Sequence, residues 1–405
     1  MNKKLGLAVA GALVAFSSAA NAGITIPAGD WTVDIGGNVN AFYSHTTGSA
    51  VANSTNVINT GLLPAAIGFG GKTRQNDLDI AFQFTFFTGI DSTNPSANGG
   101  IYGQNAALGT NSLNIRQAYM TIGDASWGQM KLGRDLGVYE SDAILSDMTL
   151  LGVGSGGAGT GNTTLGRIGF GYLYADWKTQ IQYQSPNWNG LQFTVAADTP
   201  WQDSNYLTPF NGGSWSGNSA SGYQNNNKDM GFEGKATYDF AANDATGRVW
   251  VGGITQKVNA KGIGSYTGSY SYTANGWDIG GKAAYAGAEL VASYYSGEGI
   301  GRTGFLMGGY DVNAGKKLNS DGYYVQGTYK LPTIGTKLGL SYGESNVDLA
   351  SGHQDQQSSW VVGAYHPLTK SVNLVAEYTY SMYEVKGVSP ETNAKTVSLG
   401  AIMFF

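Results

Sequence analysis

Histidine is the side chain most often used for acid–base catalysis and metal binding, and this chain has only three: His45, His353 and His366. They are scattered, and their spacing matches no metal-binding motif. Cysteine is absent, which excludes disulfides, thiolate metal sites and a cysteine nucleophile. Because no nucleophile is recognisable beside a base, we predict that the protein is not an enzyme and needs no cofactor.

Two other patterns could carry chemistry, but each has a simpler interpretation. Residues 152–159 contain the G-x-G-x-x-G spacing of dinucleotide-binding loops, yet lack the preceding strand and following helix that this fingerprint requires. A glycine-rich loop is therefore expected. Asp77 and Asp79 could together bind a divalent cation. Solvated acids on the inner face of a sheet are the favoured interpretation.

The N-terminus has the features of a secretory signal peptide. Lys3 and Lys4 precede an apolar run of about a dozen residues, which is shorter than the ~20 that a membrane-spanning helix needs, and Ala22 completes an Ala-Asn-Ala cleavage site. We predict cleavage of residues 1–22, leaving a single domain, 23–405. This mature chain has 21 basic and 28 acidic side chains, a formal charge of −7, so nucleic acid is not an expected partner.

The elements that position these side chains are predicted from alternation. The chain has 25 Tyr, 15 Phe, 9 Trp and 62 Gly, and no apolar segment long enough for a transmembrane helix. In the first strand Val39, Ala41 and Tyr43 alternate with Asn38 and Asn40, and similar alternation recurs along the chain. Soluble β-sandwiches and water-filled membrane barrels both alternate in this way, so alternation alone leaves both open.

Breakers between the alternating segments indicate sixteen strands, joined by connections that are short and long in turn. The predicted strands are 31–45, 61–72, 77–90, 112–123, 127–135, 167–184, 189–199, 228–241, 246–258, 273–286, 288–297, 321–331, 335–346, 358–367, 370–384 and 394–405. An even strand number with short turns on one side is typical of bacterial outer-membrane barrels. Because hydrocarbon offers no partner for backbone polar groups, the last strand must pair with the first.

Several short motifs resemble the general bacterial porins. They are I-R-Q-A-Y at 115–119, W-G-Q-M-K-L-G-R at 127–134, I-G-F-G-G-K at 67–72 and I-Q-Y-Q-S-P-N-W at 181–188, in the order found in that family. The terminal Phe405 resembles the aromatic residue by which the barrel-assembly machinery recognises such proteins. The resemblance implies an all-β fold, a sixteen-stranded antiparallel transmembrane barrel in the outer membrane of a Gram-negative bacterium, in contact with its lipid and lipopolysaccharide.

The resemblance further implies a homotrimer and a water-filled pore that is narrowed by a third extracellular loop folded inward. Here that loop would begin after Arg134, run to Leu151 and continue through 152–161. Its acids Glu140, Asp142 and Asp147 would then face basic residues of the barrel wall. Size and charge at this constriction would limit the diffusion of ions and small hydrophilic solutes.

The parity of each strand predicts which charges reach the lumen. Arg116 shares its face with Asn114 and Ala118, opposite Ile115 and Tyr119, and is the first choice for a basic residue at the constriction. Lys178 is a second. The acids expected to face the lumen are Asp34, Asp77, Asp79, Asp176 and Glu377. Arg134 shares parity with Met130 and Leu132, so we expect it on the outer face near a subunit contact.

Two positions that are often basic in the family align here with Ala66 and Asp176, so the wall has fewer basic residues than the resemblance implies. With the acidic loop, this predicts a weakly cation-selective or unselective diffusion channel. A substrate-specific porin with a solute site at the constriction is the alternative. A barrel acting mainly as an adhesin or enzyme is a third possibility, from another class.

Overall fold

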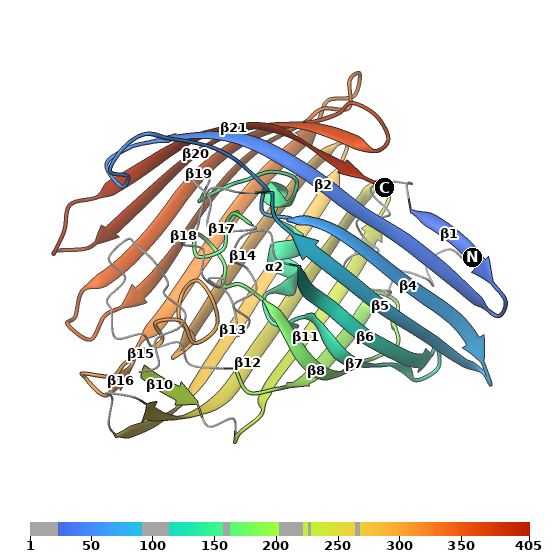
Figure 1. Cartoon of the computed structure of the whole chain (residues 1–405), viewed down its shortest axis with the longest axis horizontal. Helices are drawn as coiled ribbons and strands as arrows, with labels where there is room; N and C mark the ends of the chain where they lie inside the picture. Colours follow the sequence, from blue (N-terminus) through green and yellow to red (C-terminus); the bar gives the residue numbers. More distant parts are fainter. Residues whose placement is uncertain (1–22, 91–112, 157–162, 202–221, 226–227, 264–267) are drawn as a thin grey trace.

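The computed structural model describes residues 23–90, 113–156, 163–201, 222–225, 228–263 and 268–405. The predicted signal peptide, 1–22, lies outside the described residues. Sixteen long strands form one antiparallel sheet (Figure 1). They are β2 Trp31–Thr47, β4 Ala65–Gln75, β5 Leu78–Thr88, β6 Asn114–Asp124, β7 Gly128–Leu136, β8 Trp177–Gln184, β9 Leu191–Asp198, β11 Gly231–Ala242, β12 Ala245–Ile263, β13 Ser269–Tyr285, β14 Ala288–Glu298, β17 Asn319–Lys330, β18 Lys337–Asp348, β19 Gln354–Pro367, β20 Val372–Val385 and β21 Thr392–Phe404.

Each of these strands pairs with the next along the chain, and β21 pairs with β2, so the sheet closes on itself. The register places Asn38 opposite Phe404 and Thr47 opposite Lys395. Beyond this ladder the backbone of Phe405 exchanges two hydrogen bonds with Gly37, of 2.8 and 3.1 Å. The prediction of a sixteen-stranded antiparallel barrel is confirmed.

Strand β2 is covered along both edges because two short strands complete its pairing. β1 (Ile24–Ala28) pairs with the part of β2 that lies beyond the end of β21, and β3 (Thr55–Asn59) with the part beyond β4. Three further short strands are β10 (Gly222–Asn225), β15 (Tyr310–Asp311) and β16 (Lys316–Lys317). An uncovered edge in a membrane would leave backbone N–H and C=O groups without partners, which explains this coverage.

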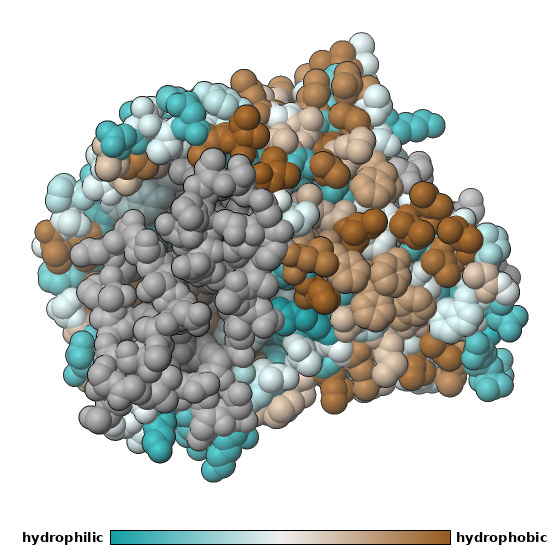
Figure 2. All heavy atoms as spheres, viewed as in Figure 1, coloured by the Kyte–Doolittle hydropathy of each residue, from teal (hydrophilic) through white to brown (hydrophobic). Residues whose placement is uncertain are grey.

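The two faces of the sheet differ in polarity as a barrel around water requires. In β2 the side chains of Asn38, Asn40 and Ser44 are buried on the inner face, while Val39 and Tyr43 are about half exposed on the outer face. The outer surface over β4 and β5 is accordingly apolar, with exposed side chains such as Ile67, Phe69 and Phe84 (Figure 2).

The predicted strand 167–184 is wrong in its first half. Residues 167–176 belong to a long irregular connection, and only Trp177–Gln184 forms β8. The same connection holds the helix α2 (Ser141–Leu145) and the 3-10 turn η2 (Met148–Leu151). Within the described residues, no helix is long and apolar enough to cross a membrane.

Candidate functional site

The described part of the connection between β7 and β8, residues 137–156 and 163–176, lies inside the barrel and is called the inward segment below (Figure 1). The predicted loop residues 157–161 lie outside the described residues. Its contacts show on which face of the sheet it lies. The Tyr324 hydroxyl donates to the Ala143 carbonyl (2.8 Å), and the Gln326 side chain accepts from the Met148 N–H (2.8 Å). Tyr324 and Gln326 are almost fully buried, whereas Val325 between them is 53% exposed on the outer face.

Glu377 of β20 binds the backbone of the inward segment. Its Oε2 accepts hydrogen bonds from the N–H groups of Val153 and Gly154, each 2.8 Å long, and its Oε1 accepts from the Tyr365 hydroxyl at 2.6 Å. Gly152 permits this approach, because a Cβ there would lie 2.1 Å from Oε1. The structure thus places Glu377, which parity assigned to the lumen, under the inward segment.

Glu233 of β11 has the same role at the start of the segment, and sequence reasoning missed it. Its carboxylate accepts from the N–H groups of Val138 and Tyr139, the latter at 2.9 Å, and pairs with the ammonium of Lys178. Glu233 and Lys178 are both buried. The alternation that applies elsewhere could have identified Glu233, because its neighbour Phe232 is exposed on the outer face.

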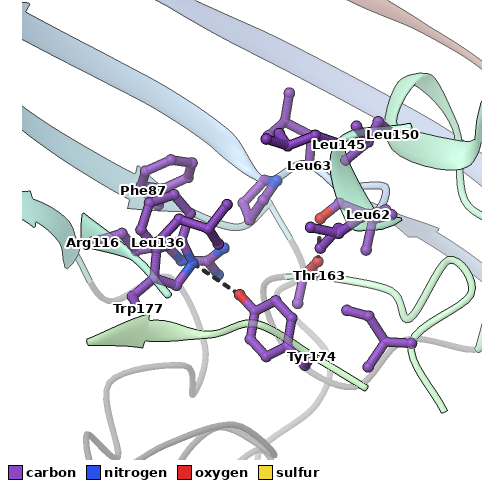
Figure 3. A pocket seen from close by; sticks show the side chains of 13 residues that line it. Leu62, Leu63, Phe87, Arg116, Leu136, Leu145, Leu150, Thr163, Tyr174 and Trp177 are labelled. Carbon is purple, nitrogen blue, oxygen red and sulfur yellow. Dashed lines mark hydrogen bonds between the residues drawn. The ribbon is translucent and has the colours of Figure 1, made fainter. Parts of the chain in front are cut away.

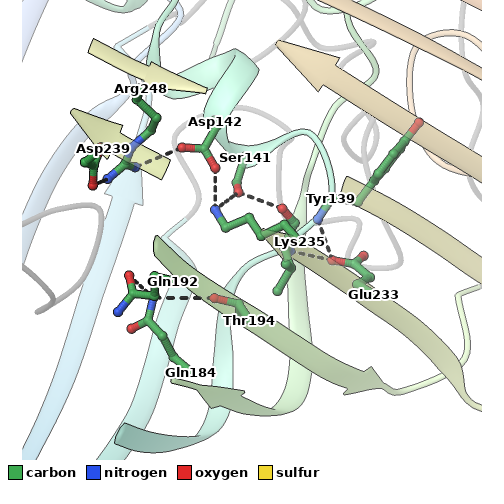
Figure 4. A network of polar contacts seen from close by, with 11 residues as sticks. Tyr139, Ser141, Asp142, Gln184, Gln192, Thr194, Glu233, Lys235, Asp239 and Arg248 are labelled. Carbon is green, nitrogen blue, oxygen red and sulfur yellow. Dashed lines mark hydrogen bonds and ion pairs between the residues drawn. The ribbon is translucent and has the colours of Figure 1, made fainter. Parts of the chain in front are cut away.

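Asp142 in α2 is held by two basic side chains of the wall (Figure 4). Its carboxylate lies 2.6 Å from the Lys235 Nζ and 3.0 Å from the Arg248 Nη1, and Arg248 also pairs with Asp239 at 2.6 Å. Burial acts to raise the pKa of Asp142, but the charges and hydrogen bonds of Lys235 and Arg248 outweigh it and hold this pKa below its ordinary value. The basic residues facing Asp142 are therefore not those that the sequence suggested.

Glu140 and Asp147 have no cationic partner within 4.0 Å among the described residues. Asp147 accepts from the N–H of Thr149 (2.9 Å) and the hydroxyl of Tyr172 (2.8 Å). Glu140 is 1% exposed, has a left-handed φ of 61° and finds no hydrogen-bond partner for either carboxylate oxygen in the described part of the chain. Burial, and then the nearby charge of Asp278, raise the pKa of Glu140 well above its ordinary value.

Arg167 joins the far part of the inward segment to the wall, and it too was missed. It is fully buried, and its guanidinium donates to the side chain and carbonyl of Ser341 at 2.5 and 2.6 Å and to the carbonyl of Ser359 at 3.2 Å. Neutral acceptors thus satisfy this buried cation. Its position could not be predicted, because the sequence pattern predicts a strand over 167–184.

Asp176 ends the inward segment just before β8. Its backbone adopts a left-handed φ of 56°, its carbonyl accepts from the Gly137 N–H (2.7 Å), and its carboxylate accepts from the N–H of Trp177 (2.7 Å). Burial is the main cause that raises the pKa of Asp176 to about 6. One backbone hydrogen bond, between Gly137 and Asp176, therefore joins the two ends of the segment.

Arg116 occupies a β-bulge in β6. Thr85 pairs with Gln117, but the next residue, Phe86, pairs with Ile115, so Arg116 is an extra residue without a partner in the register. Its guanidinium is 5% exposed and lies over the ring of Phe87, 4.8 Å from the centroid.

Because of the bulge, the faces predicted for Ala118 and Tyr119 are wrong. Ala118 pairs with the exposed Phe84 and therefore faces outward, not inward with Arg116 as predicted. Tyr119, predicted outward, pairs with Gln83, and the Lys131 ammonium lies 4.9 Å from the centroid of its ring. An extra residue shifts every side chain beyond it to the opposite face.

The remaining predicted acids lie away from the inward segment. Asp34 pairs with Lys72 (3.2 Å), and Asp79 with Arg74 (2.8 Å), all with substantially exposed side chains. Asp77 lies in the turn between β4 and β5 with a φ of 63°, so its assignment to a strand facing the lumen is wrong. Within the described residues, no group of three or more His, Cys, Asp or Glu side chains could hold a metal ion.

Arg134 of β7 pairs in register with Ala118 and Thr179, which is the outer-face row of these strands. Its Nε is buried and has no hydrogen-bond partner in the described part of the chain.

Solved structures of the same architecture are numerous. The outer membrane channel DcaP of Acinetobacter baumannii is 16% identical, with a TM-score of 0.63 over 94% of this chain and 99% of that one. An anion-selective porin from Comamonas acidovorans is 15% identical, with a TM-score of 0.61 over 93% and 100%. The trimer form of OmpT of Vibrio cholerae is 16% identical, with a TM-score of 0.55 over 93% and 99%. At these identities the likeness shows the fold.

Among curated protein sequences, none matches this chain. A family model described as Gram-negative porin matches residues 8–386, which is nearly the whole sequence. The motifs, the closed sixteen-stranded sheet and the polar interior agree with that match. The chain therefore belongs to the Gram-negative porin family and is an outer-membrane channel for the diffusion of solutes.

Proposed function

We propose that this porin is weakly cation-selective or nearly unselective, and that the inward segment and the facing wall strands border its narrowest part. Small hydrophilic solutes and ions would pass there down their gradients. Arg116, Lys178, Glu140, Asp142 and Asp147 remain the proposed constriction residues, with Lys235 and Arg248 added to them.

The balance of unpaired charge supports this preference. The wall cations next to the segment are neutralised: Lys178 by Glu233, Lys235 by Asp142, and Arg248 by Asp142 and Asp239. The carboxyl groups of Glu140, Asp147, Asp176, Asp278 and Glu377 have no cation within 4.0 Å in the described part of the chain. Arg116 and Arg167 likewise lack a carboxylate partner there, and burial raises the pKa of Glu140 and Asp176, which favours their neutral forms. The excess of negative charge is therefore limited, and the expected preference is weak.

The test is the zero-current potential across a planar bilayer that separates two KCl concentrations. The proposal expects a potential near zero or of the sign set by potassium. A potential of the sign set by chloride would contradict it. Measurement at two ionic strengths is the control, because a preference due to fixed charge weakens as salt screens that charge.

We further infer export with cleavage of residues 1–22 and assembly as a homotrimer in contact with lipid and lipopolysaccharide, after insertion by the barrel-assembly machinery through Phe405. N-terminal sequencing of the protein from outer membranes tests the first inference, with Gly23 as the expected first residue. The trimer form of OmpT, which has the same fold, and the place of Arg134 on the outer-face row support the second. Arg134 is the proposed subunit contact.

A substrate-specific porin of the same architecture remains a second candidate, because a pocket lies between the inward segment and the wall. Conductance that one solute blocks in a saturable manner would favour it.

A further inference from the structure

A pocket of about 50 Å³ lies between the inward segment and the wall strands β5 and β6 (Figure 3). Four parts of the chain line it: the connection before β4, the wall, the α2–η2 region and the end of the inward segment. The lining residues are Leu62, Leu63, Pro64, Phe87, Arg116, Leu136, Ile144, Leu145, Leu150, Thr163, Ile168, Tyr174 and Trp177. It lies inside the barrel, so its occupant must be a solute and not a lipid of the surrounding membrane.

The lining is mostly apolar, and the Thr163 hydroxyl on the leucine side donates to the Leu62 carbonyl at 2.6 Å. Leucine and isoleucine side chains make up most of it, and Arg116 is the only charged residue. The polar groups near Arg116 are already partly engaged, because the indole N–H of Trp177 donates to the Tyr174 hydroxyl at 2.8 Å. In Figure 3 Arg116, Phe87 and Trp177 form one side of the pocket, and Leu62, Leu63 and Leu150 lie on the other.

Arg116 is nearly fully buried, yet it forms no hydrogen bond or ion pair with any residue that the structure describes. Its contacts are with aromatic faces, 4.8 Å from the Phe87 centroid and 5.9 Å from that of Trp177. Stacking leaves the N–H donors at the rim of a guanidinium able to reach an acceptor. Asp176 directly precedes Trp177 in the chain, but its carboxylate accepts from the Trp177 backbone N–H and forms no ion pair with Arg116.

An unpaired buried charge is costly, and the cost falls when an anion supplies the missing acceptors. We propose that this pocket binds a small amphipathic monocarboxylate, whose carboxylate is bound by Arg116 and whose short acyl chain is enclosed by the leucines. The volume has room for roughly four water-sized groups, which suits a chain of a few carbons. Such binding does not depend on the ion preference of the pore.

Other ligand classes fit less well. A cation would meet the charge of Arg116, and a neutral apolar molecule would leave that charge unpaired. A doubly charged anion such as phosphate would find one cation and an apolar remainder. The combination of one guanidinium with an apolar wall therefore selects a single negative charge joined to hydrocarbon.

The first experiment uses the unmodified full-length porin in detergent micelles and isothermal titration with three probes of similar size. Butanoate has both the charge and the chain, acetate has the charge with a shorter chain, and 1-butanol has the chain without the charge. We expect butanoate to bind at least about tenfold more tightly than acetate, because it buries two more methylenes. We expect the same margin over 1-butanol, because only butanoate has a charge that pairs with Arg116. Equal affinity for butanoate and either other probe would overturn the proposal.

Variants locate the site. Arg116→Met keeps the bulk of the side chain but removes its charge, and should weaken butanoate binding by at least about tenfold. Leu145→Trp keeps Arg116 and fills the pocket, and should weaken binding by at least as much. Arg74→Met removes an exposed arginine of β4 that is paired with Asp79, and should leave the affinity unchanged within about twofold.

Gel mobility and circular dichroism establish that each variant is folded before titration. If Arg116→Met does not fold, Leu145→Trp and the comparison of the three probes still test whether the pocket binds a monocarboxylate. Binding by a folded Arg116→Met or Leu145→Trp that matches the unmodified porin within about twofold would overturn the proposal.

Discussion

Glu233 and Glu377 each bind two successive backbone N–H groups of the inward segment, at 138–139 and 153–154. An irregular segment inside a barrel has no partner strand, so its N–H groups need acceptors from the wall. Ionised carboxylates accept such bonds more strongly than neutral groups. These two side chains therefore fix the segment to the wall in a chain that has no cysteine for a disulfide.

We expect Glu233→Gln to lower the free energy of unfolding by about 3 kcal/mol, because it leaves the buried Lys178 without a counter-charge. Urea titration of the protein in lipid vesicles, followed by tryptophan fluorescence, measures this change. Asp79→Asn is the matched control, since its pair with Arg74 is exposed, and should cost less than about 1 kcal/mol. Equal effects of the two substitutions would show that the buried pair does not hold the segment.

The ion preference should depend on pH through Glu140. Burial raises the pKa of this carboxyl, so it is neutral below that raised pKa and negatively charged above it. Cation preference should therefore rise as pH rises, by roughly twofold in permeability ratio, because screening in a narrow aqueous pore is incomplete.

Zero-current potentials at a series of pH values, from weakly acidic to alkaline, measure this dependence, and Glu140→Gln should abolish the part that Glu140 causes. Glu391→Gln changes an exposed residue outside the strands and should leave the profile as it is in the unmodified porin. A profile that Glu140→Gln leaves unaltered would show that Glu140 does not act on the permeating ions.

At the scale of elements, the inward segment is bound to the wall along most of its described length. Ser155, on this segment, lies with its hydroxyl oxygen 3.2 Å from that of Ser359 on β19. The chain has no cysteine, so a pair introduced here would have no competing thiol.

We expect the double substitution Ser155→Cys and Ser359→Cys to form a disulfide under mild oxidation. Because the segment already lies against the wall, single-channel conductance should change by less than about a quarter between the oxidised and reduced forms. Ser155→Cys alone is the control for the effect of the substitution. Failure of the folded double variant to cross-link, or a severalfold rise in conductance on reduction, would contradict a fixed segment.

Strand number, order and most strand bounds could be predicted from alternation and breakers, because a barrel wall repeats one simple pattern. The inward segment could not. Ile168, Phe170 and Tyr172 alternate with glycines as in a strand, yet they belong to the inward segment and are buried there. Alternation shows only that successive side chains meet different surroundings. It does not show whether those surroundings are lipid, the water of the lumen or a packed loop.

The partner of each charged side chain was harder to predict than the face of the sheet on which the side chain lies. Parity predicted only that Lys178 and Glu377 face the inside of the barrel. Asp142 pairs with Lys235 and Arg248, which are 93 and 106 residues away along the chain. Which strands face the segment depends on closure of the whole barrel. The bulge at Arg116 moves Ala118 and Tyr119 to the opposite faces of the sheet. No residue type in this part of the sequence indicates that a bulge forms there.

At the scale of the whole molecule, closure leaves the outer face as the surface that contacts lipid and any further copies of the chain. Arg134 is on the outer-face row, where a charged side chain is costly in contact with hydrocarbon. A neighbouring subunit packed against this part of the wall would shield the guanidinium from hydrocarbon and offer it polar partners. We therefore expect Arg134→Met to weaken the trimer, lowering its dissociation temperature by several degrees, about the effect of one lost charge-assisted hydrogen bond.

Migration of the heated, unreduced protein on a detergent gel measures this temperature. Lys370→Met, which removes an exposed charge from the turn between β19 and β20, is the control and should leave the temperature unchanged. A trimer of unaltered stability in Arg134→Met would remove Arg134 from the interface, and a folded protein that runs as a monomer before heating would contradict the trimer itself.

Single-channel recording of the unmodified protein in a planar bilayer with symmetric KCl tests the central claim most directly. A water-filled barrel narrowed by a fixed inward segment should give long-lived steps of uniform size, with a conductance that rises in proportion to salt concentration. Protein that is folded and inserted, yet gives no conductance steps or a conductance independent of salt, would contradict an open diffusion channel.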